Sequence, residues 1–318
     1  MPDTVIIIPC YNEFDRLPVS EFKEYARHSK RVRFVFVDDG STDRTGELLE
    51  SLSSLDGTAF QIVSLSRNRG KGEAVREGFH AALGHSPKYV GYWDADLATP
   101  LDEIARFCRV LDESPNTEIV MGARVILMGH RIERRLVRHY LGRLSASLAS
   151  FALGIRIYDA MCGAKLIRVT PRTLGLFTSP FSSRWVFDVE MAARFVHDTP
   201  PSLNRSGESA ICELALQQWR EIRGSKLRWP DFVRATVDLA KIFWRYRCQT
   251  PSAHRRGATV AGQLESVHQP DISSPPSLAI SGRGSSTTGI ATDCVPGRSD
   301  WIGNLVESDA NAAPAQAR

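Results

Sequence analysis

The sequence predicts an α/β protein with an open, mostly parallel sheet, because short apolar segments alternate with helical segments over its first third. The expected strands are Val5–Pro9, Arg33–Asp38, Phe60–Leu65, Tyr89–Trp93 and Glu118–Met121. Each is short and rich in β-branched or aromatic residues, as strands buried on both faces are. Helices between successive strands imply right-handed crossovers, which make the strands parallel.

Two helix starts are indicated by capping residues. The Ser-Thr-Asp triplet at 41–43 can cap a helix over 44–52. Thr99, with Pro100 at the first helical position, predicts a helix that ends near Leu111.

Composition limits the class of protein. The chain has 318 residues, of which 42% are hydrophobic and 24% charged, as in soluble globular proteins. Its net charge of +4 is too small to indicate a nucleic-acid partner. Six cysteines without C-x-x-C spacing indicate reduced thiols rather than disulfides or a zinc site. With no signal peptide and no apolar run of about 18 residues, we expect a cytoplasmic protein, soluble or peripheral on a membrane.

The chain divides into two regions. Residues 1–248 carry all the strand and helix signals and form the expected catalytic domain. Residues 249–318 are rich in Ser, Gly, Pro, Ala and Thr, with Trp301 as their only aromatic residue. Such a composition buries too little apolar surface to fold alone, so we expect a disordered tail without chemistry.

Polar clusters follow the first four strands. They are YNE after the first, DDGSTD after the second, RNRGKG after the third and DADLAT after the fourth. The carboxyl ends of parallel strands meet at one edge of a sheet, where ligands bind in such folds. The four clusters therefore predict a single site.

Asp94 and Asp96 are the candidate metal ligands. Alternate residues on a strand face the same side, so both carboxylates can point at one position beyond the strand end. A divalent cation would relieve their repulsion, and Mg²⁺ or Mn²⁺ commonly bridges carboxylates to substrate phosphates. A surface turn with a capping aspartate is the alternative, which the D-x-D spacing alone does not exclude.

The second and third clusters suit a nucleotide. Asp38 and Asp39 can accept hydrogen bonds from a ribose or a base, although a plain strand-to-helix turn also explains part of this cluster. The glycines beside Lys71 permit close approach of a diphosphate, but the P-loop pattern is absent and an ordinary helix start fits equally well.

Two basic segments suggest an anionic membrane surface. The first carries arginines spaced along one helical face, and the second is a helix over Asp231–Arg247 in which aromatic and basic residues alternate. A basic helix with an apolar face can lie at the headgroup level, whereas a solvated surface is the alternative. The residues are Arg131, Arg134, Arg135 and Arg138, and then Lys241, Phe243, Trp244, Arg245, Tyr246 and Arg247.

Taken together, eight motifs between Val5 and Arg247 resemble a known family. Five resemble family 2 glycosyltransferases of the GT-A fold: PCYNE (9–13), VDDGSTD (37–43), RNRGKG (67–72), DADLAT (94–99) and GAR (122–124). Three more resemble the dolichyl-phosphate glucosyltransferase branch, which is close to the dolichol-phosphate mannose synthases: DAMCGAKL (159–166), RWVFDVEM (184–191) and WREIRGSKL (219–227).

The resemblance implies transfer of a hexose from a nucleotide sugar to a polyprenyl phosphate, with inversion at the anomeric carbon. Lys226 would contact the diphosphate, and Asp94, Ala95 and Asp96 would bind the metal–diphosphate. The nucleotide would contact Pro9, Tyr11, Asn12, Glu13, Val37, Asp39 and Lys71.

Ala98 bears on the sugar. Mannose synthases of this type carry a glutamine there, so alanine favours glucose from UDP-glucose over mannose from GDP-mannose. The family that the chain resembles commonly has N-terminal or C-terminal membrane spans; we expect none here, so attachment would rest on the two basic segments.

The expected chemistry needs few groups. A lipid phosphate is already ionised and needs positive charge to position it, for which Arg124 and the arginine face are candidates. A hydroxyl acceptor would need a base, for which Asp159 is the candidate. Rival functions are transfer to a polysaccharide or small acceptor, and nucleotide-sugar binding at a membrane without catalysis. An NAD-dependent oxidoreductase is excluded because no G-x-G-x-x-G follows the first strand.

Overall fold

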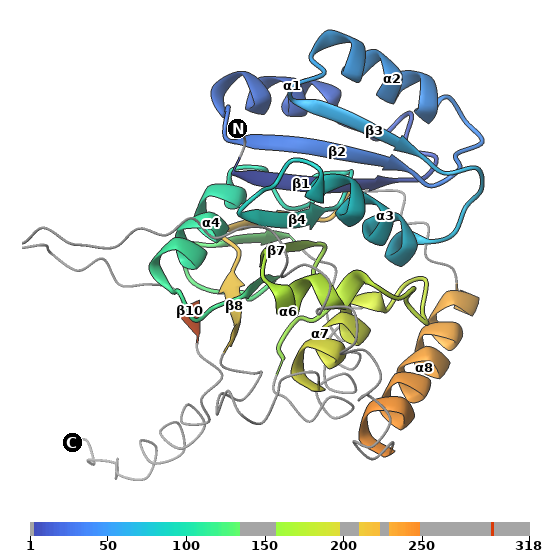
Figure 1. The fold of residues 1–318 in the computed structure, drawn as a ribbon. Helices are drawn as coiled ribbons and strands as arrows, with labels where there is room; N and C mark the ends of the chain where they lie inside the picture. Colours follow the sequence, from blue (N-terminus) through green and yellow to red (C-terminus); the bar gives the residue numbers. More distant parts are fainter. Residues whose placement is uncertain (1–2, 134–156, 198–209, 223–228, 249–293, 296–318) are drawn as a thin grey trace, which may run out of the picture.

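The computed structural model describes residues 3–133, 157–197, 210–222, 229–248 and 294–295, and it confirms an α/β fold with a mostly parallel sheet (Figure 1). The strands are β1 (Thr4–Cys10), β2 (Val32–Asp38), β3 (Phe60–Ser64), β4 (Tyr89–Trp93), β5 (Ile119–Ala123), β6 (Arg131–Glu133), β7 (Ala164–Arg168), β8 (Ile211–Ala215), β9 (Gln218–Arg220) and β10 (Cys294–Val295). The helices are α1 (Val19–His28), α2 (Thr45–Leu55), α3 (Lys71–Leu83), α4 (Glu103–Glu113), α6 (Pro171–Leu174), α7 (Phe187–His197) and α8 (Trp229–Phe243), with a 3-10 turn η1 (Gly175–Phe177) and a π-helical turn η4 (Trp244–Cys248).

The main sheet has the order β10-β8-β5-β7-β4-β1-β2-β3. Strands β4, β1, β2 and β3 are parallel, as the alternation of strands and helices predicts. β7 runs antiparallel between β4 and β5. This inserted strand brings the segment just before it, residues 159–163, to the carboxyl ends of β4 and β5.

Helices cover both faces of the sheet, because alternate residues of each central strand point to opposite sides. Ile6, Ile8 and Phe34 face a core formed with α1, α2 and α4. Val5 and Ile7 face a second core formed with α3, α7 and α8. The parallel strands are therefore buried on both faces, and their carboxyl ends meet at an edge left to loops (Figure 1).

Two helices begin later than the sequence predicts. α4 begins at Glu103, and Thr99 does not cap it, because residues 100–104 first form a turn in which Glu103 N–H donates to the Pro100 carbonyl. α2 begins at Thr45, whose backbone N–H and hydroxyl both donate to the Asp43 carboxylate.

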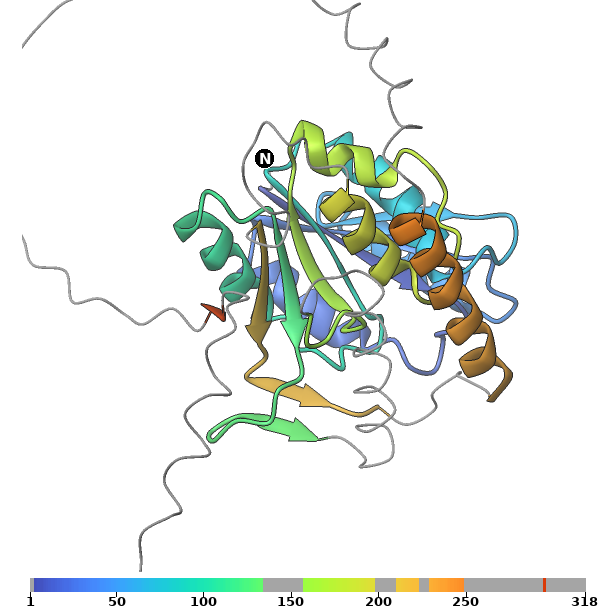
Figure 2. The same cartoon turned by 90° about the horizontal axis from the view of Figure 1, so that it is seen from below.

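The prediction that Arg131 lies on a helix is wrong. Arg131 begins β6, which pairs in parallel with β9, and its N–H donates to the Gln217 carbonyl. Figure 2 shows these two short strands, in green and yellow, side by side beyond the ends of β5 and β8. The other arginines of that expected face, Arg134, Arg135 and Arg138, lie outside the described residues. So does the expected tail, apart from the β10 residues.

A buried ion pair joins β7 to α7 beneath the carboxyl end of β4. Lys165 Nζ lies 2.6 Å from an oxygen of Asp188 and donates to the Cys162 carbonyl, and both side chains are almost fully buried. The Tyr92 hydroxyl donates to the same Asp188 oxygen, and burial followed by the charge of Asp188 raises the pKa of Tyr92 well above its usual value. Lys165 thus fixes the chain just before β7.

Replacing Lys165 with Met should lower the free energy of unfolding by about 3–5 kcal/mol, because Asp188 would stay buried without its cation. The double variant Lys165→Met/Asp188→Leu should recover part of that loss. Urea denaturation measures both. Lys88→Met is the matched control, since the Lys88–Asp112 pair is about half exposed, and it should cost about 1 kcal/mol or less. A Lys165→Met protein as stable as the wild type would contradict this role.

Candidate active site

The loops after β1 and β2 are tied together by hydrogen bonds. Asn12 N–H donates to the Ser41 hydroxyl, and the Asn12 side-chain oxygen accepts from Thr42 N–H at 2.8 Å. Glu13 N–H donates to the Thr45 hydroxyl at 2.8 Å. Asn12 itself has a positive φ of 52°, which asparagine tolerates better than most residues. The sequence-predicted Tyr11, Asn12 and Glu13 therefore lie at the edge where β1 and β2 end.

The paired aspartates after β2 hold neighbouring loops. Asp39 accepts from the backbone N–H groups of Arg69 and Gly70 at 2.6 and 2.8 Å, and burial raises its pKa despite these bonds. Asp38 accepts from Ser41 N–H. Gly40, with φ 65°, lets this loop pass the backbone at Arg67, which a Cβ would approach to 2.4 Å. Both carboxylates thus have structural partners.

Asp94 lies at the end of β4 against the backbone of Gly163. Its N–H donates to the Gly163 carbonyl at 3.0 Å. A Cβ at Gly163 would lie 1.8 Å from an Asp94 carboxylate oxygen, so any larger residue would displace this carboxylate from its present position. The side chain of Asp94 is 40% exposed, and its Oδ1 lies 2.5 Å from Lys71 Nζ. Burial alone would lower the pKa of Lys71, but the charges of Asp94, Asp188 and Asp96 outweigh it and raise that pKa.

Asp96 makes a separate ion pair across the edge. Arg16 Nη2, from the loop after β1, lies 2.7 Å from an Asp96 oxygen. Burial and then repulsion from Asp94 raise the pKa of Asp96, and the Ala98 N–H and Arg16 oppose that rise. The two carboxylates therefore interact with each other, and each has a cationic neighbour: Lys71 at the start of α3 for Asp94 and Arg16 in the loop after β1 for Asp96.

This donor set fits a divalent cation carried with a diphosphate. Within the described ranges, no three His, Cys, Asp or Glu side chains gather as a complete metal cage. Mg²⁺ is typically held by one or two carboxylates, with substrate phosphates and water completing its shell. Asp94 and Asp96 supply such a pair of carboxylates. Lys71 and Arg16 lie beside them and suit the negative charge of phosphates.

Arg124 and Asp159 form a bidentate pair next to the end of β5. Arg124 Nε and Nη2 donate to the two Asp159 oxygens at 2.6 and 2.7 Å. Burial would lower the pKa of Arg124, but the carboxylate of Asp159 overrides this and raises it. Glu213 on β8 accepts from the N–H groups of Tyr158 and Asp159, and burial raises its pKa. The guanidinium is thereby held in one orientation.

The other sequence-predicted residues divide into three groups. Pro9 and Ala95 lie at the ends of β1 and β4. The side chain of Val37 is fully buried in the core beneath α3. Lys226 lies outside the described residues. Arg16 and Gly163 are not among the predicted site residues. Gly163 belongs to the DAMCGAKL motif, but no local spacing distinguishes Arg16.

Comparison with known proteins shows the family of this chain. The model of glycosyl transferase family 2 matches residues 5–172. The chain is 32% identical to dolichyl-phosphate beta-glucosyltransferase of Mus musculus, over 76% of this chain and 75% of that one. Identity is 30% to the same-named proteins of Homo sapiens and Saccharomyces cerevisiae, over 76% of this chain and 75% and 74% of theirs.

A solved structure shares the fold. Glucosyl-3-phosphoglycerate synthase from Mycobacterium tuberculosis, crystallised with Mn²⁺, UDP and glucosyl-3-phosphoglycerate, superposes with a TM-score of 0.53 at 18% identity, covering 79% of this chain and 82% of that one. With the strand-end motifs, the carboxylate pair and the family match in agreement, the chain belongs to glycosyl transferase family 2.

Proposed function

We propose that this protein transfers glucose from UDP-glucose to a polyprenyl phosphate of the dolichyl type, with inversion at the anomeric carbon. The observation that carries the proposal is the set of dolichyl-phosphate beta-glucosyltransferases at about 30% identity over three quarters of the chain. Ala98, whose N–H donates to Asp96, stands where the mannose synthases that the chain resembles carry glutamine, and this favours glucose over mannose.

The site suits departure of a nucleoside diphosphate. Cleaving the bond between sugar and nucleotide leaves extra negative charge on the diphosphate. When bound, Mg²⁺ or Mn²⁺ supplies positive charge that stabilises this leaving group. Asp94 and Asp96 would hold the cation, while Lys71 and Arg16 place fixed positive charge next to them.

The acceptor end suits an ionised phosphate. Such a phosphate attacks without losing a proton, so it needs positive groups and no general base. Asp159 directs both oxygens at Arg124, which supports a positioning role for Asp159 rather than the role of a base. Arg124 is then the candidate that orients the acceptor phosphate.

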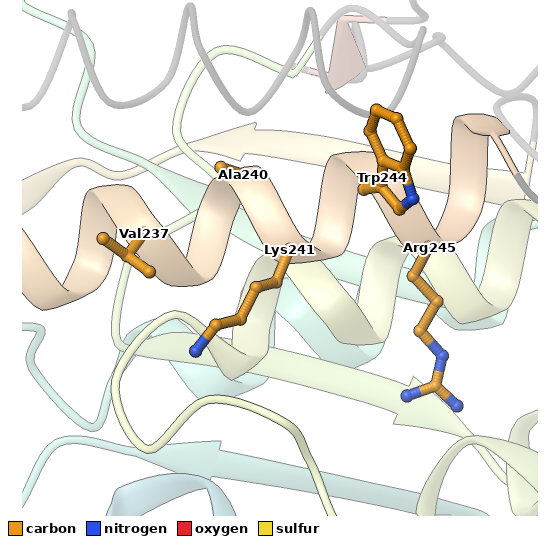
Figure 3. A pocket seen from close by; sticks show the side chains of 5 residues that line it. All are labelled: Val237, Ala240, Lys241, Trp244 and Arg245. Atoms are coloured by element: carbon orange, nitrogen blue, oxygen red, sulfur yellow. The ribbon is translucent and has the colours of Figure 1, made fainter.

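Attachment to the cytoplasmic face of an anionic membrane is part of the proposal. No helix within the described ranges combines the length and apolar character needed to cross a bilayer. An exposed basic-aromatic surface on α8 and η4 supports peripheral contact, with Lys241 and Arg245 directed to one side and Trp244 68% exposed (Figure 3). Tyr246 instead stacks on His197, so only part of the expected aromatic pattern faces outward.

Purified protein incubated with UDP-glucose, polyprenyl phosphate and Mn²⁺ or Mg²⁺ should give a labelled glucosyl lipid. GDP-mannose in place of UDP-glucose should give little product, and chelation of the metal should stop the reaction. Mannosyl lipid as the main product, or glucose transfer only to a water-soluble sugar, would contradict the proposal.

Gly163→Ala should reduce transfer by about a hundredfold or more, because the added Cβ displaces the Asp94 carboxylate. The loss should approach that of Asp94→Asn, while the thermal midpoint stays close to that of the wild type. Gly175→Ala is the matched control: a Cβ there meets nothing within 4 Å, and transfer should be unchanged. Full activity of Gly163→Ala would show that the position of Asp94 does not matter.

A further inference from the structure

The loop between β5 and β6 exposes three consecutive large aliphatic side chains. Ile126 is 65% exposed, Leu127 47% and Met128 fully exposed. Isolated exposed apolar residues are ordinary, but three in a row at a loop tip are not. None of the hydrogen bonds, ion pairs or core contacts described above uses these side chains.

The loop is anchored at both ends, so the tip is presented by a fixed frame. Arg124, at its start, is clamped by Asp159. At its end, His130 Nδ1 lies 2.8 Å from the Leu216 carbonyl, and Arg131 pairs with β9. Between them, His130 N–H donates to the Leu127 carbonyl, which closes a tight turn.

The tip projects away from the body of the protein. Gly129, at φ 82°, makes the turn possible, and a Cβ there would meet nothing within 4 Å. Figure 2 shows the green loop between β5 and β6 turning at the outer edge of the fold. The apolar surface is therefore convex, whereas small-molecule sites are concave.

We propose that Ile126, Leu127 and Met128 insert into the surface of an anionic lipid bilayer. Between Gly122 and Ile132 the chain has no acidic residue, and the exposed Arg131 follows the tip, which suits anionic headgroups. Three side chains cover far less than the roughly 800 Å² per partner that a stable protein interface buries. A bilayer therefore suits this tip better than a second copy of the chain does.

This inference rests on the proposed function and indicates how the site would be oriented at the membrane. The loop begins at Arg124, the candidate group for the acceptor phosphate. Seating the tip among lipids would place the end of β5 close to the headgroup level, where a polyprenyl phosphate presents its phosphate.

Flotation of the full chain with phosphatidylcholine vesicles containing phosphatidylserine tests the loop. The triple variant Ile126→Ser/Leu127→Ser/Met128→Ser should bind at least about tenfold more weakly than the wild type. Leu55→Ser, which removes a 65% exposed leucine from α2, is the matched control and should bind like the wild type. Arg131→Ala should bind vesicles that contain phosphatidylserine about fivefold more weakly than the wild type does. On vesicles without phosphatidylserine, the two proteins should bind equally.

Met128→Asp changes a single fully exposed residue and should also weaken binding, which guards against misfolding of the triple variant. Triple-variant binding equal to that of the wild type, absence of wild-type binding, or a wild-type dimer that the triple variant converts to a monomer would each overturn the proposal.

Transfer to a short-chain, water-soluble polyprenyl phosphate separates this inference from the proposed function. Wild type and triple variant should use that acceptor equally. If neither transfers glucose while vesicle binding still depends on the loop, the function fails and the membrane contact stands. If both transfer glucose and the vesicles bind both equally, the membrane contact fails and the function stands.

Discussion

The arrangement of the site depends on the contact between the Asp94 carboxylate and the backbone of Gly163. Two aspartates one residue apart repel each other, and holding them at a sheet edge requires compensating contacts. The inserted strand β7 provides the first, because Gly163 just before it accepts the Asp94 N–H and leaves room for the carboxylate. The buried pair of Lys165 and Asp188 fixes that backbone from below. Lys71 at the start of α3 and Arg16 in the loop after β1 then balance the charges of the two carboxylates.

The same inserted segment serves the other half of the site. Asp159 lies only a few residues before Gly163, and it clamps Arg124 at the end of β5. One short stretch, 159–165, thus positions the Asp94 carboxylate suited to a metal–diphosphate and the Arg124 guanidinium suited to an acceptor phosphate. Those are the two charged ends of the transfer that we propose.

Much of the fold could be predicted from sequence because its signals are local. Tyr89–Trp93 was predicted at its observed bounds, and the convergence of the polar loops follows from parallel strands. The Arg16–Asp96 pair could not be predicted, since it joins loops far apart in the chain. The prediction that Arg131 lies on a helix was wrong because pairing with β9, which is distant in the chain, overrides the local pattern. Val37 is predicted to lie beside the base and ribose, and alternation along β2 places its side chain in the core.

Asp94 and Asp96 are the proposed holders of a divalent cation that carries the nucleoside diphosphate. Calorimetric titration of the protein with UDP, with and without Mn²⁺, tests this without any acceptor or membrane. We expect Mn²⁺ to strengthen UDP binding by about tenfold or more in the wild type and to have little effect in Asp94→Asn. Equal affinity for UDP with and without Mn²⁺ in the wild type, or an undiminished metal effect in the variant, would contradict the account.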